Sequence, residues 1–214
     1  MEIIYLGHSC FKLKGKEKSV ICDPFDPRML NIRLPKQECD IVTISHEHQD
    51  HNFLDNVACL RVVRDPGEYE IGGVSIVGFS SFHDNEKGEK RGKNTIYLIE
   101  IDGVRVLHLG DLGHILTDSL VSEIGVVDVL MVPVGGEFTI GPKEASEVVT
   151  KIGAKRVIPM HYKALGISDM FSKLSDLSDF FKLTGLKVEN LAKLSIKANE
   201  ENGDEQIIYA LEKK

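Results

Sequence analysis

The sequence contains no apolar run of about 18 residues, which is the length that a helix needs to cross a membrane. Its first residues have neither the basic stretch nor the long apolar segment of a signal peptide, so we expect a cytoplasmic protein. A positive charge excess is also absent: the net charge is −7. Binding to long nucleic acids or to anionic membranes requires a positive surface, so neither partner is expected.

Two motifs are missing as well: a pair of cysteines that could bind zinc, and the motif around a nucleophilic serine. The four cysteines (Cys10, Cys22, Cys39 and Cys59) form no Cys-x-x-Cys pair, which predicts buried free thiols and no cysteine-based zinc site. No Gly-x-Ser-x-Gly motif marks a nucleophilic serine. A serine hydrolase is therefore not expected.

Short strands fill the first half of the sequence, and helices enter in the second half. No repeat and no Pro/Gly/Ser-rich linker divides the chain, which predicts one α+β domain over residues 1–214. Strands are expected at 2–6, 10–13, 19–22, 41–45, 60–63, 69–71, 74–79, 95–101, 104–109, 127–132, 156–159, 188–197 and 206–211. Helices are expected at 52–59, 141–152 and 168–183.

The segment His-Glu-His-Gln-Asp-His at 46–51 is the most informative feature that is present. It follows the buried strand predicted around residues 41–44, so its side chains would be held stiffly. Alternate side chains of an extended segment point the same way, so His46 and His48 would share one metal ion, and Asp50 and His51 would hold a second. Imidazole suits zinc, iron, nickel and copper, and carboxylate extends the range to manganese.

Three further candidate ligands each follow a predicted strand: His83, Asp111 and His161. Together with the 46–51 segment they make a set of five histidines and two aspartates. A catalytic zinc keeps about three protein ligands and an open position, so this set is too large for one ion. It suits two divalent ions, zinc or manganese, with one carboxylate between them.

This ligand order resembles the metallo-β-lactamase-fold hydrolase superfamily: the His-x-His-x-Asp-His segment, a lone His83, the Gly-Asp pair ending at Asp111, and His161 after a short strand. Asp23, in Cys-Asp-Pro, resembles the carboxylate of the superfamily's first motif, which supports the ligand turn. The segment Leu-Gly-His-Ser-Cys-Phe at 6–11 and the Pro-Val-Gly-Gly turn at 133–136 resemble the ascorbate-6-phosphate-lactonase-like branch.

The resemblance implies a four-layer αββα sandwich with the site at one edge of the two sheets. It also implies how the ligands divide between two ions. The first ion would be held by His46, His48 and His83, and the second by Asp50, His51 and His161. Asp111 would bridge the two ions.

Such a pair of ions would share a water whose pKa falls from 15.7 toward about 7, which yields a bridging hydroxide near neutral pH. Asp50 would orient or deprotonate this nucleophile. We therefore expect a binuclear hydrolase that cleaves a lactone or ester bond of a small anionic metabolite. A phosphodiesterase acting on cyclic or small nucleotides and a non-catalytic metal-bound scaffold are the alternatives, and a homo-oligomer is compatible with the sequence.

Several other residues are expected near the site. His8 and Lys163 are expected to bind substrate, although His8 would equally fit a simple turn. His108 is interpreted as a core histidine with a supporting role as its alternative, and His114 as an exposed loop residue that would alternatively line the pocket. The cationic segment 87–93 is interpreted as a solvated loop that would alternatively attract an anionic substrate.

Overall fold

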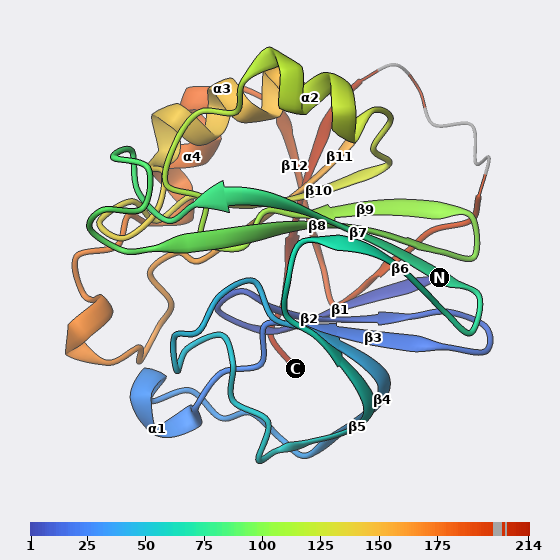
Figure 1. Ribbon diagram of the computed structural model, residues 1–214. Helices are drawn as coiled ribbons and strands as arrows, with labels where there is room; N and C mark the ends of the chain where they lie inside the picture. The colour runs from blue at the N-terminus through green and yellow to red at the C-terminus, as the bar shows by residue number, and fades with distance from the viewer. Residues whose placement is uncertain (199–202, 204) are drawn as a thin grey trace.

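Two β-sheets lie face to face in the computed structural model, which describes residues 1–198, 203 and 205–214 (Figure 1). The six-stranded sheet, in the order β13-β1-β2-β3-β4-β5, comprises β1 (Glu2–Gly7), β2 (Cys10–Lys14), β3 (Ser19–Cys22), β4 (Gln37–Thr43), β5 (Val57–Val63) and β13 (Leu194–Ser195). The eight-stranded sheet, in the order β12-β14-β11-β10-β9-β8-β7-β6, comprises β6 (Gly67–Ile71), β7 (Val74–Phe82), β8 (Lys93–Ile101), β9 (Val104–His108), β10 (Val129–Pro133), β11 (Arg156–Met160), β12 (Lys187–Leu191) and β14 (Ile207–Leu211).

Strand direction brings the ends of several strands to one edge of the sandwich. In the eight-stranded sheet β9, β10 and β11 are parallel, and β7 shares their direction because β7 and β9 are both antiparallel to β8. In the other sheet β3, β4 and β5 are parallel. Loops that follow parallel strands lie on the same side of a sheet, and this is where binding residues collect in such folds.

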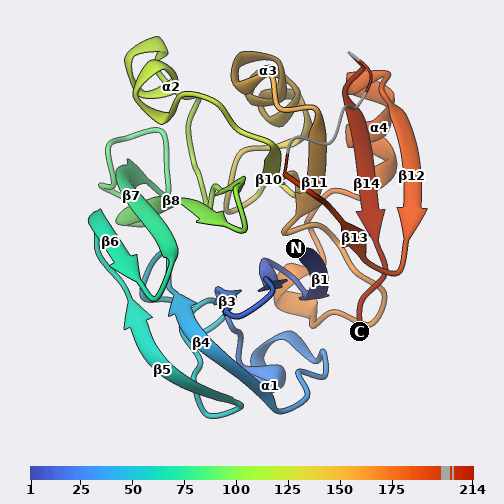
Figure 2. The same cartoon turned by 90° about the vertical axis from the view of Figure 1, so that its right-hand side faces the viewer.

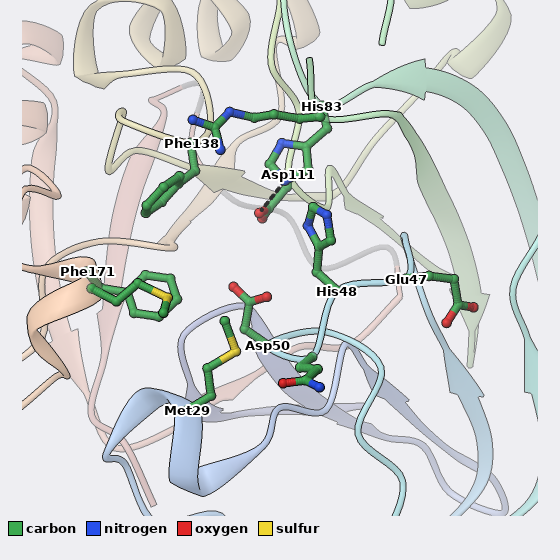
Figure 3. Close-up of a pocket in the computed structure, with 11 residues that line it drawn as sticks. Met29, Glu47, His48, Asp50, His83, Asp111, Phe138 and Phe171 are labelled. Carbon is green, nitrogen blue, oxygen red and sulfur yellow. Dashed lines mark ion pairs between the residues drawn. The ribbon is translucent and has the colours of Figure 1, made fainter. Parts of the chain in front are cut away.

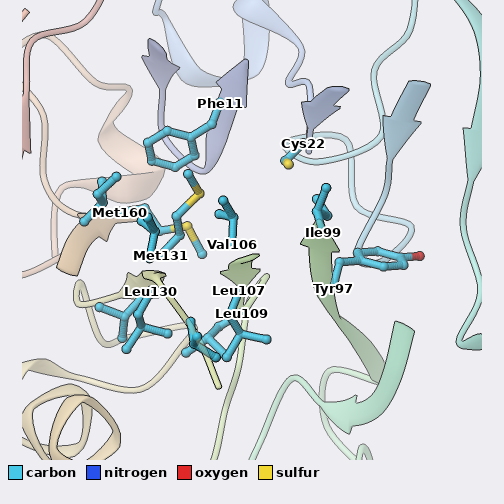
Figure 4. Packing of buried hydrophobic residues seen from close by; sticks show 14 of the residues in the cluster. Phe11, Cys22, Tyr97, Ile99, Val106, Leu107, Leu109, Leu130, Met131 and Met160 are labelled. Atoms are coloured by element: carbon cyan, nitrogen blue, oxygen red, sulfur yellow. The ribbon is translucent and has the colours of Figure 1, made fainter. Parts of the chain in front are cut away.

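Side chains of the six-stranded sheet alternate between two apolar cores, as the period of two in a strand requires. Phe11 and Ile41 belong to the core shared with the eight-stranded sheet. Their neighbours Cys10 and Val42 belong to a second core on the outer face. Figure 4 shows Phe11 reaching toward Met131 across the space between the sheets.

The helices are α1 (Pro27–Leu30), α2 (Asp118–Ile124), α3 (Pro142–Ile152), the 3-10 helix η1 (Asp169–Phe171) and α4 (Leu177–Thr184). Helices α2, α3 and α4 cover the outer face of the eight-stranded sheet, whereas α1 lies beside the six-stranded sheet (Figures 1 and 2). The αββα layering is therefore confirmed, with unequal helical layers. No helix within the described residues is long and apolar enough to cross a membrane.

Helix α3 matches the helix predicted at 141–152. Pro142 occupies its first turn, where no intrahelical N–H is needed. Gly153 ends it in the left-handed conformation, with φ of 69°, and its N–H donates to the carbonyl of Val149.

The helix predicted at 52–59 is wrong. Residues from Val57 onward form the edge strand β5, which pairs in parallel with β4 through Gln37–Val57 and Cys39–Cys59. The β-branched residues Val57, Val62 and Val63 favour a strand, and the loop before it turns the chain back toward the start of β4.

The single helix predicted at 168–183 is also wrong, because the chain forms η1 and α4 with a turn and a short non-helical connection between them. Ser175 in this connection donates its N–H to the carbonyl of Gly135 and accepts from the N–H of Lys163. Phe171 packs in the outer core of the six-stranded sheet, whereas Phe180 packs in the core of the eight-stranded sheet. The regular apolar spacing therefore serves two separate cores.

Candidate metal centre

The seven predicted ligands come together in the structure. The loops after β4, β7, β9 and β11 carry them to the same edge of the sandwich, at the end where α1 lies. Their ligand atoms form three overlapping groups, with the atoms of each group within 4.8 Å of one another: His46, His48 and His83; His46, His51 and Asp111; and Asp50, His51 and His161 with His8.

Asp111 lies between the groups. Its Oδ2 is 3.3 Å from Nε2 of His83, 3.2 Å from Nε2 of His161 and 3.9 Å from Nε2 of His46. Its Oδ1 is 3.2 Å from Nε2 of His51. Figure 3 shows the contact with His83 at the pocket wall. One carboxylate thus touches imidazoles from both predicted metal sets, which is the arrangement expected of a bridging ligand.

Several of these ligand atoms are buried and make no hydrogen bond within the described part of the chain: Nε2 of His46, His51 and His161, and Oδ1 of Asp111. A buried polar atom without a hydrogen bond costs about 1–3 kcal/mol. Neutral imidazole nitrogens and carboxylate oxygens that all point to one place are the donors that divalent transition metals bind. The residues therefore fit divalent ions.

Asp23, at the end of β3, holds the ligand turn from behind. Its Oδ1 accepts the N–H of Ser45 at 2.8 Å, and its Oδ2 accepts the Oγ–H of Ser45 at 2.6 Å and contacts Nδ1 of His51 at 2.9 Å. With its Nδ1–H donated to Asp23, His51 presents Nε2 to the cluster. Burial would raise the pKa of Asp23, but the contact with His51 and the nearby histidines lower it overall, so the carboxyl stays ionised.

The ionisation states suit a cation site. Burial lowers the pKa of His46 to about 3, so this imidazole is neutral near neutral pH. Burial would raise the pKa of Asp111, but the His161 and His51 imidazoles hold it well below its usual range. His51 differs: burial would lower its pKa, yet Asp111 and Asp50 raise it well above the ordinary value. A metal ion would therefore displace a proton from His51.

His8 lies in the turn between β1 and β2 with a positive φ of 55°. Its Nε2 is 3.2 Å from Oδ2 of Asp50, and the residue is buried. Burial, together with His161, lowers the pKa of His8 to about 4. The structure thus places His8 behind Asp50, in a position to orient that carboxylate, and its contact with substrate stays a prediction.

Lys163 follows His161 by two residues and is exposed. Among the described residues it is absent from the linings of the two hollows at the cluster. Its role in substrate binding stays a prediction.

The two remaining histidines near Asp111 have structural partners. His108 is fully buried: its Nε2 donates to the carbonyl of Ser9 at 2.9 Å, and its Nδ1 accepts the N–H of Gly110 at 3.2 Å. The interpretation as a core histidine is confirmed. His114 lies in a loop, as expected, but it is half-buried and its Nε2 accepts the N–H of Phe82 at 3.3 Å, so the expected exposure is wrong.

Two ligand loops pack directly against glycines. A Cβ atom at Gly113 would lie 2.3 Å from the carbonyl carbon of His83, and one at Gly135 would lie 2.1 Å from the carbonyl oxygen of His161. Side chains cannot approach a backbone so closely, so these positions require glycine. The spacing between ligand loops therefore depends on residues that carry no side chain.

Two hollows open onto the cluster. The first, of about 370 Å³, is lined by the cluster residues His48, Asp50, His83 and Asp111 and by a wall that includes Met29, Phe138, Met170 and Phe171 (Figure 3). The second, of about 680 Å³, lies on the other side of His48 and is lined mainly by residues 64–66, 80–82 and 91–95. Arg91 lines both hollows.

The loop that carries Arg91 is organised by one carboxylate. Asp84 accepts the backbone N–H groups of Glu86, Gly88, Lys90 and Arg91 at 2.7–3.0 Å. Burial would raise the pKa of Asp84, but these four groups lower it to about 2. The sequence signal was an aspartate followed by Asn-Glu-Lys-Gly, a pattern typical of side-chain-stabilised turns. In the sequence, nothing sets Arg91 apart from the other cations of the segment 87–93.

The comparisons with known proteins agree with this geometry. Residues 2–161 match the family model described as "Beta-lactamase superfamily domain". A UPF0173 metal-dependent hydrolase of Thermococcus onnurineus is 30% identical over 218 residues, which cover 88% of this chain and 94% of the relative. A UPF0173 metal-dependent hydrolase of Methanospirillum hungatei is 32% identical over 205 residues, 84% of this chain and 89% of the relative.

Among solved structures, a Thermotoga maritima protein assigned to the metallo-β-lactamase superfamily as a Zn-dependent hydrolase superposes with a TM-score of 0.80. It is 39% identical, and the match covers 98% of each chain. The chain described here therefore belongs to the metallo-β-lactamase superfamily and, within it, to the UPF0173 family of metal-dependent hydrolases.

Proposed function

We propose that the protein is a binuclear hydrolase that cleaves an ester or lactone bond of a small anionic metabolite. The observation that carries this proposal is the position of Asp111, which lines an open pocket and whose two oxygens contact imidazoles of both predicted metal sets. The motif at residues 6–11, which resembles the ascorbate-6-phosphate-lactonase-like branch, supports a lactone as the substrate.

The ligands would divide between two ions: His46, His48 and His83 would hold one, Asp50, His51 and His161 would hold the other, and Asp111 would serve both. Bound there, two divalent ions, zinc or manganese, would polarise the substrate carbonyl and lower the pKa of a shared water toward about 7.

Asp50 is the carboxylate that would act on the attacking water, because it lines the pocket, whereas Asp111 contacts imidazoles of both ligand sets. Burial would raise the pKa of Asp50, but His51 and His8 keep it below the usual range. Such a carboxylate is a weak base, so its main role is to accept a hydrogen bond from the water and orient it. His8, 3.2 Å from Asp50, would fix the carboxylate in that position.

The size of the pocket favours a small substrate. Ligand pockets commonly span about 300–1,000 Å³, and the first hollow, at about 370 Å³, lies near the lower end. The second hollow, with Arg64, Arg91 and Lys93 in its lining, supports the alternative of a small phosphodiester.

A substrate panel tests the proposal. The protein would be loaded with zinc or manganese and assayed with lactones, p-nitrophenyl carboxylic esters, bis-p-nitrophenyl phosphate and cyclic nucleotides. The panel would be repeated with His48→Ala and Asp111→Asn. The matched control is Asp40→Asn, because the Asp40 carboxylate accepts from Ser19 and Lys18 on the surface of β4, outside the cluster.

We expect metal-dependent turnover of esters or lactones that survives in Asp40→Asn and is lost in the two cluster variants. Turnover of phosphodiesters alone would select the alternative. Equal activity in the cluster variants and the wild type, or no metal-dependent turnover of any substrate, would contradict the proposal.

A further inference from the structure

We propose that Arg91 is the specificity-determining residue of the pocket, and that it binds an anionic group of a substrate whose apolar part lies against Phe138 and Phe171. The reaction that follows rests on the proposed function, but the recognition of the anion does not. Three features of the structure carry this inference: the fixed position of Arg91, its free hydrogen-bond donors, and its charge in the pocket.

Arg91 is exposed, but its side chain contacts the pocket wall. Its backbone N–H is bound by Asp84, which fixes the loop. Its guanidinium carbon lies 4.8 Å from the centre of the Phe138 ring, and Nη2 donates to the carbonyl of Glu137 at 3.3 Å. A cation over an aromatic face is stabilised by the ring quadrupole, so the guanidinium is positioned before any ligand arrives.

Most of the donors of Arg91 remain available. A guanidinium has five N–H donors, and within the described residues only the one to Glu137 makes a hydrogen bond. Its neighbours differ: Lys90 pairs with Glu86, and Arg64, across the second hollow, pairs with Glu47 at 2.6 Å. A fork of free donors matches the two oxygens of a carboxylate or phosphate.

Arg91 is also the single lysine or arginine in the lining of the first hollow, within the part of the chain that the structure describes. The net charge of the chain is −7, so the protein as a whole repels anions. A guanidinium in the lining favours the entry of an anionic substrate and adds to the charge of the metal ions. The apolar wall of Met29, Phe138 and Phe171 would take up the uncharged part of such a substrate (Figure 3).

The test measures binding, so it does not depend on turnover. Isothermal titration calorimetry of the metal-loaded protein would compare butyrate, which carries one carboxylate, with succinate, glutarate and adipate, which carry two. One carboxylate serves the metal centre in every ligand, and the series varies the reach of the second one. The variants are Arg91→Gln and, as the matched control in the same loop, Lys90→Gln.

We expect at least one dicarboxylate to bind about 10- to 100-fold more tightly than butyrate in the wild type and in Lys90→Gln, because a charge-assisted hydrogen bond contributes on this scale. In Arg91→Gln this preference should disappear, while the affinity for butyrate stays the same. Thermal melting and metal content would show that the variant is folded and loaded.

An equal preference in Arg91→Gln and the wild type, or no preference in the wild type, would overturn the inference. Because no bond is cleaved in this experiment, a protein that binds dicarboxylates through Arg91 but hydrolyses no ester would contradict the proposed reaction and leave the role of Arg91 standing.

Discussion

Asp23→Asn is the substitution that probes the support of the metal centre most selectively. Asp23 is fully buried, and its side chain accepts two hydrogen bonds from Ser45 and contacts Nδ1 of His51. The volume of the side chain is unchanged in the variant, but one oxygen becomes an NH₂ group. If the NH₂ group replaced Oδ1, it would face the N–H of Ser45. If it replaced Oδ2, it would face both Oγ of Ser45 and Nδ1 of His51.

The expected losses follow from these contacts. Removing a hydrogen bond to a buried charged group costs about 1.5–3 kcal/mol of the free energy of unfolding. Replacing the partner of a metal-binding histidine weakens metal affinity by about 10- to 100-fold, which corresponds to about 1.4–2.7 kcal/mol. Because folding lowers the pKa of Asp23, its contribution to stability is present above the unfolded pKa of about 3.9 and is lost as the pH falls below it.

Two measurements check this prediction. Chelator competition gives the metal affinity, and chemical denaturation at several pH values gives the free energy of unfolding of the metal-free protein. Asp40→Asn is the control, because Asp40 accepts from the N–H and Oγ–H of Ser19 but lies far from the cluster in a partly exposed position. Wild-type metal affinity in Asp23→Asn, or an equal loss in Asp40→Asn, would refute the reasoning.

Two further predictions concern the cluster itself. Metal binding should release a proton from His51, because Asp111 and Asp50 raise its pKa against the effect of burial. The affinity for metal should therefore increase with pH, and calorimetry in buffers of different ionisation enthalpy should show the proton release. Binding heats that do not depend on the buffer would contradict this prediction. Gly135→Ala should destabilise the protein by about 1–3 kcal/mol and weaken metal binding, because the new Cβ would meet the carbonyl oxygen of His161 at 2.1 Å; a wild-type melting temperature and metal content would show that the loop adapts.

Much of the architecture could be predicted because the sequence pattern is local. Ligands that directly follow apolar strands, such as His83 after β7 and His161 after β11, mark the carboxyl edge of a sheet whatever the rest of the fold. The division of these ligands between two ions needed the resemblance to a known superfamily, since strand order cannot be read from one sequence.

The errors have physical causes that lie outside the local pattern. Residues 52–59 carry apolar side chains at a spacing that also fits a helix, but Val57 is needed to pair with Gln37 at the edge of β4. The apolar spacing of 168–183 is continuous, but Phe171 and Phe180 serve different cores. The structure of the first segment depends on long-range strand pairing, and that of the second on long-range packing. The local spacing of apolar residues contains no information about either.

Residues that line the pocket were the hardest to predict. Arg91 occurs among several lysines. Asp84 accepts the backbone N–H groups of both Lys90 and Arg91, so it is the contact of the Arg91 guanidinium with Phe138 that distinguishes Arg91 from Lys90. A charged residue on a loop acquires a role through the direction in which the loop holds it, and that direction is a property of the folded chain.

Metal content per chain, measured by mass spectrometry after loading and removal of excess ions, tests the central claim most directly. The cluster of five imidazoles and two carboxylates, one of which is Asp111, should hold two divalent ions in the wild type. His48→Ala should lose the ion at the exposed end of the cluster, and Asp111→Asn should weaken both. Fewer than two equivalents of metal in the wild-type protein would contradict the account. Two equivalents retained by Asp111→Asn as tightly as by the wild type would also contradict it.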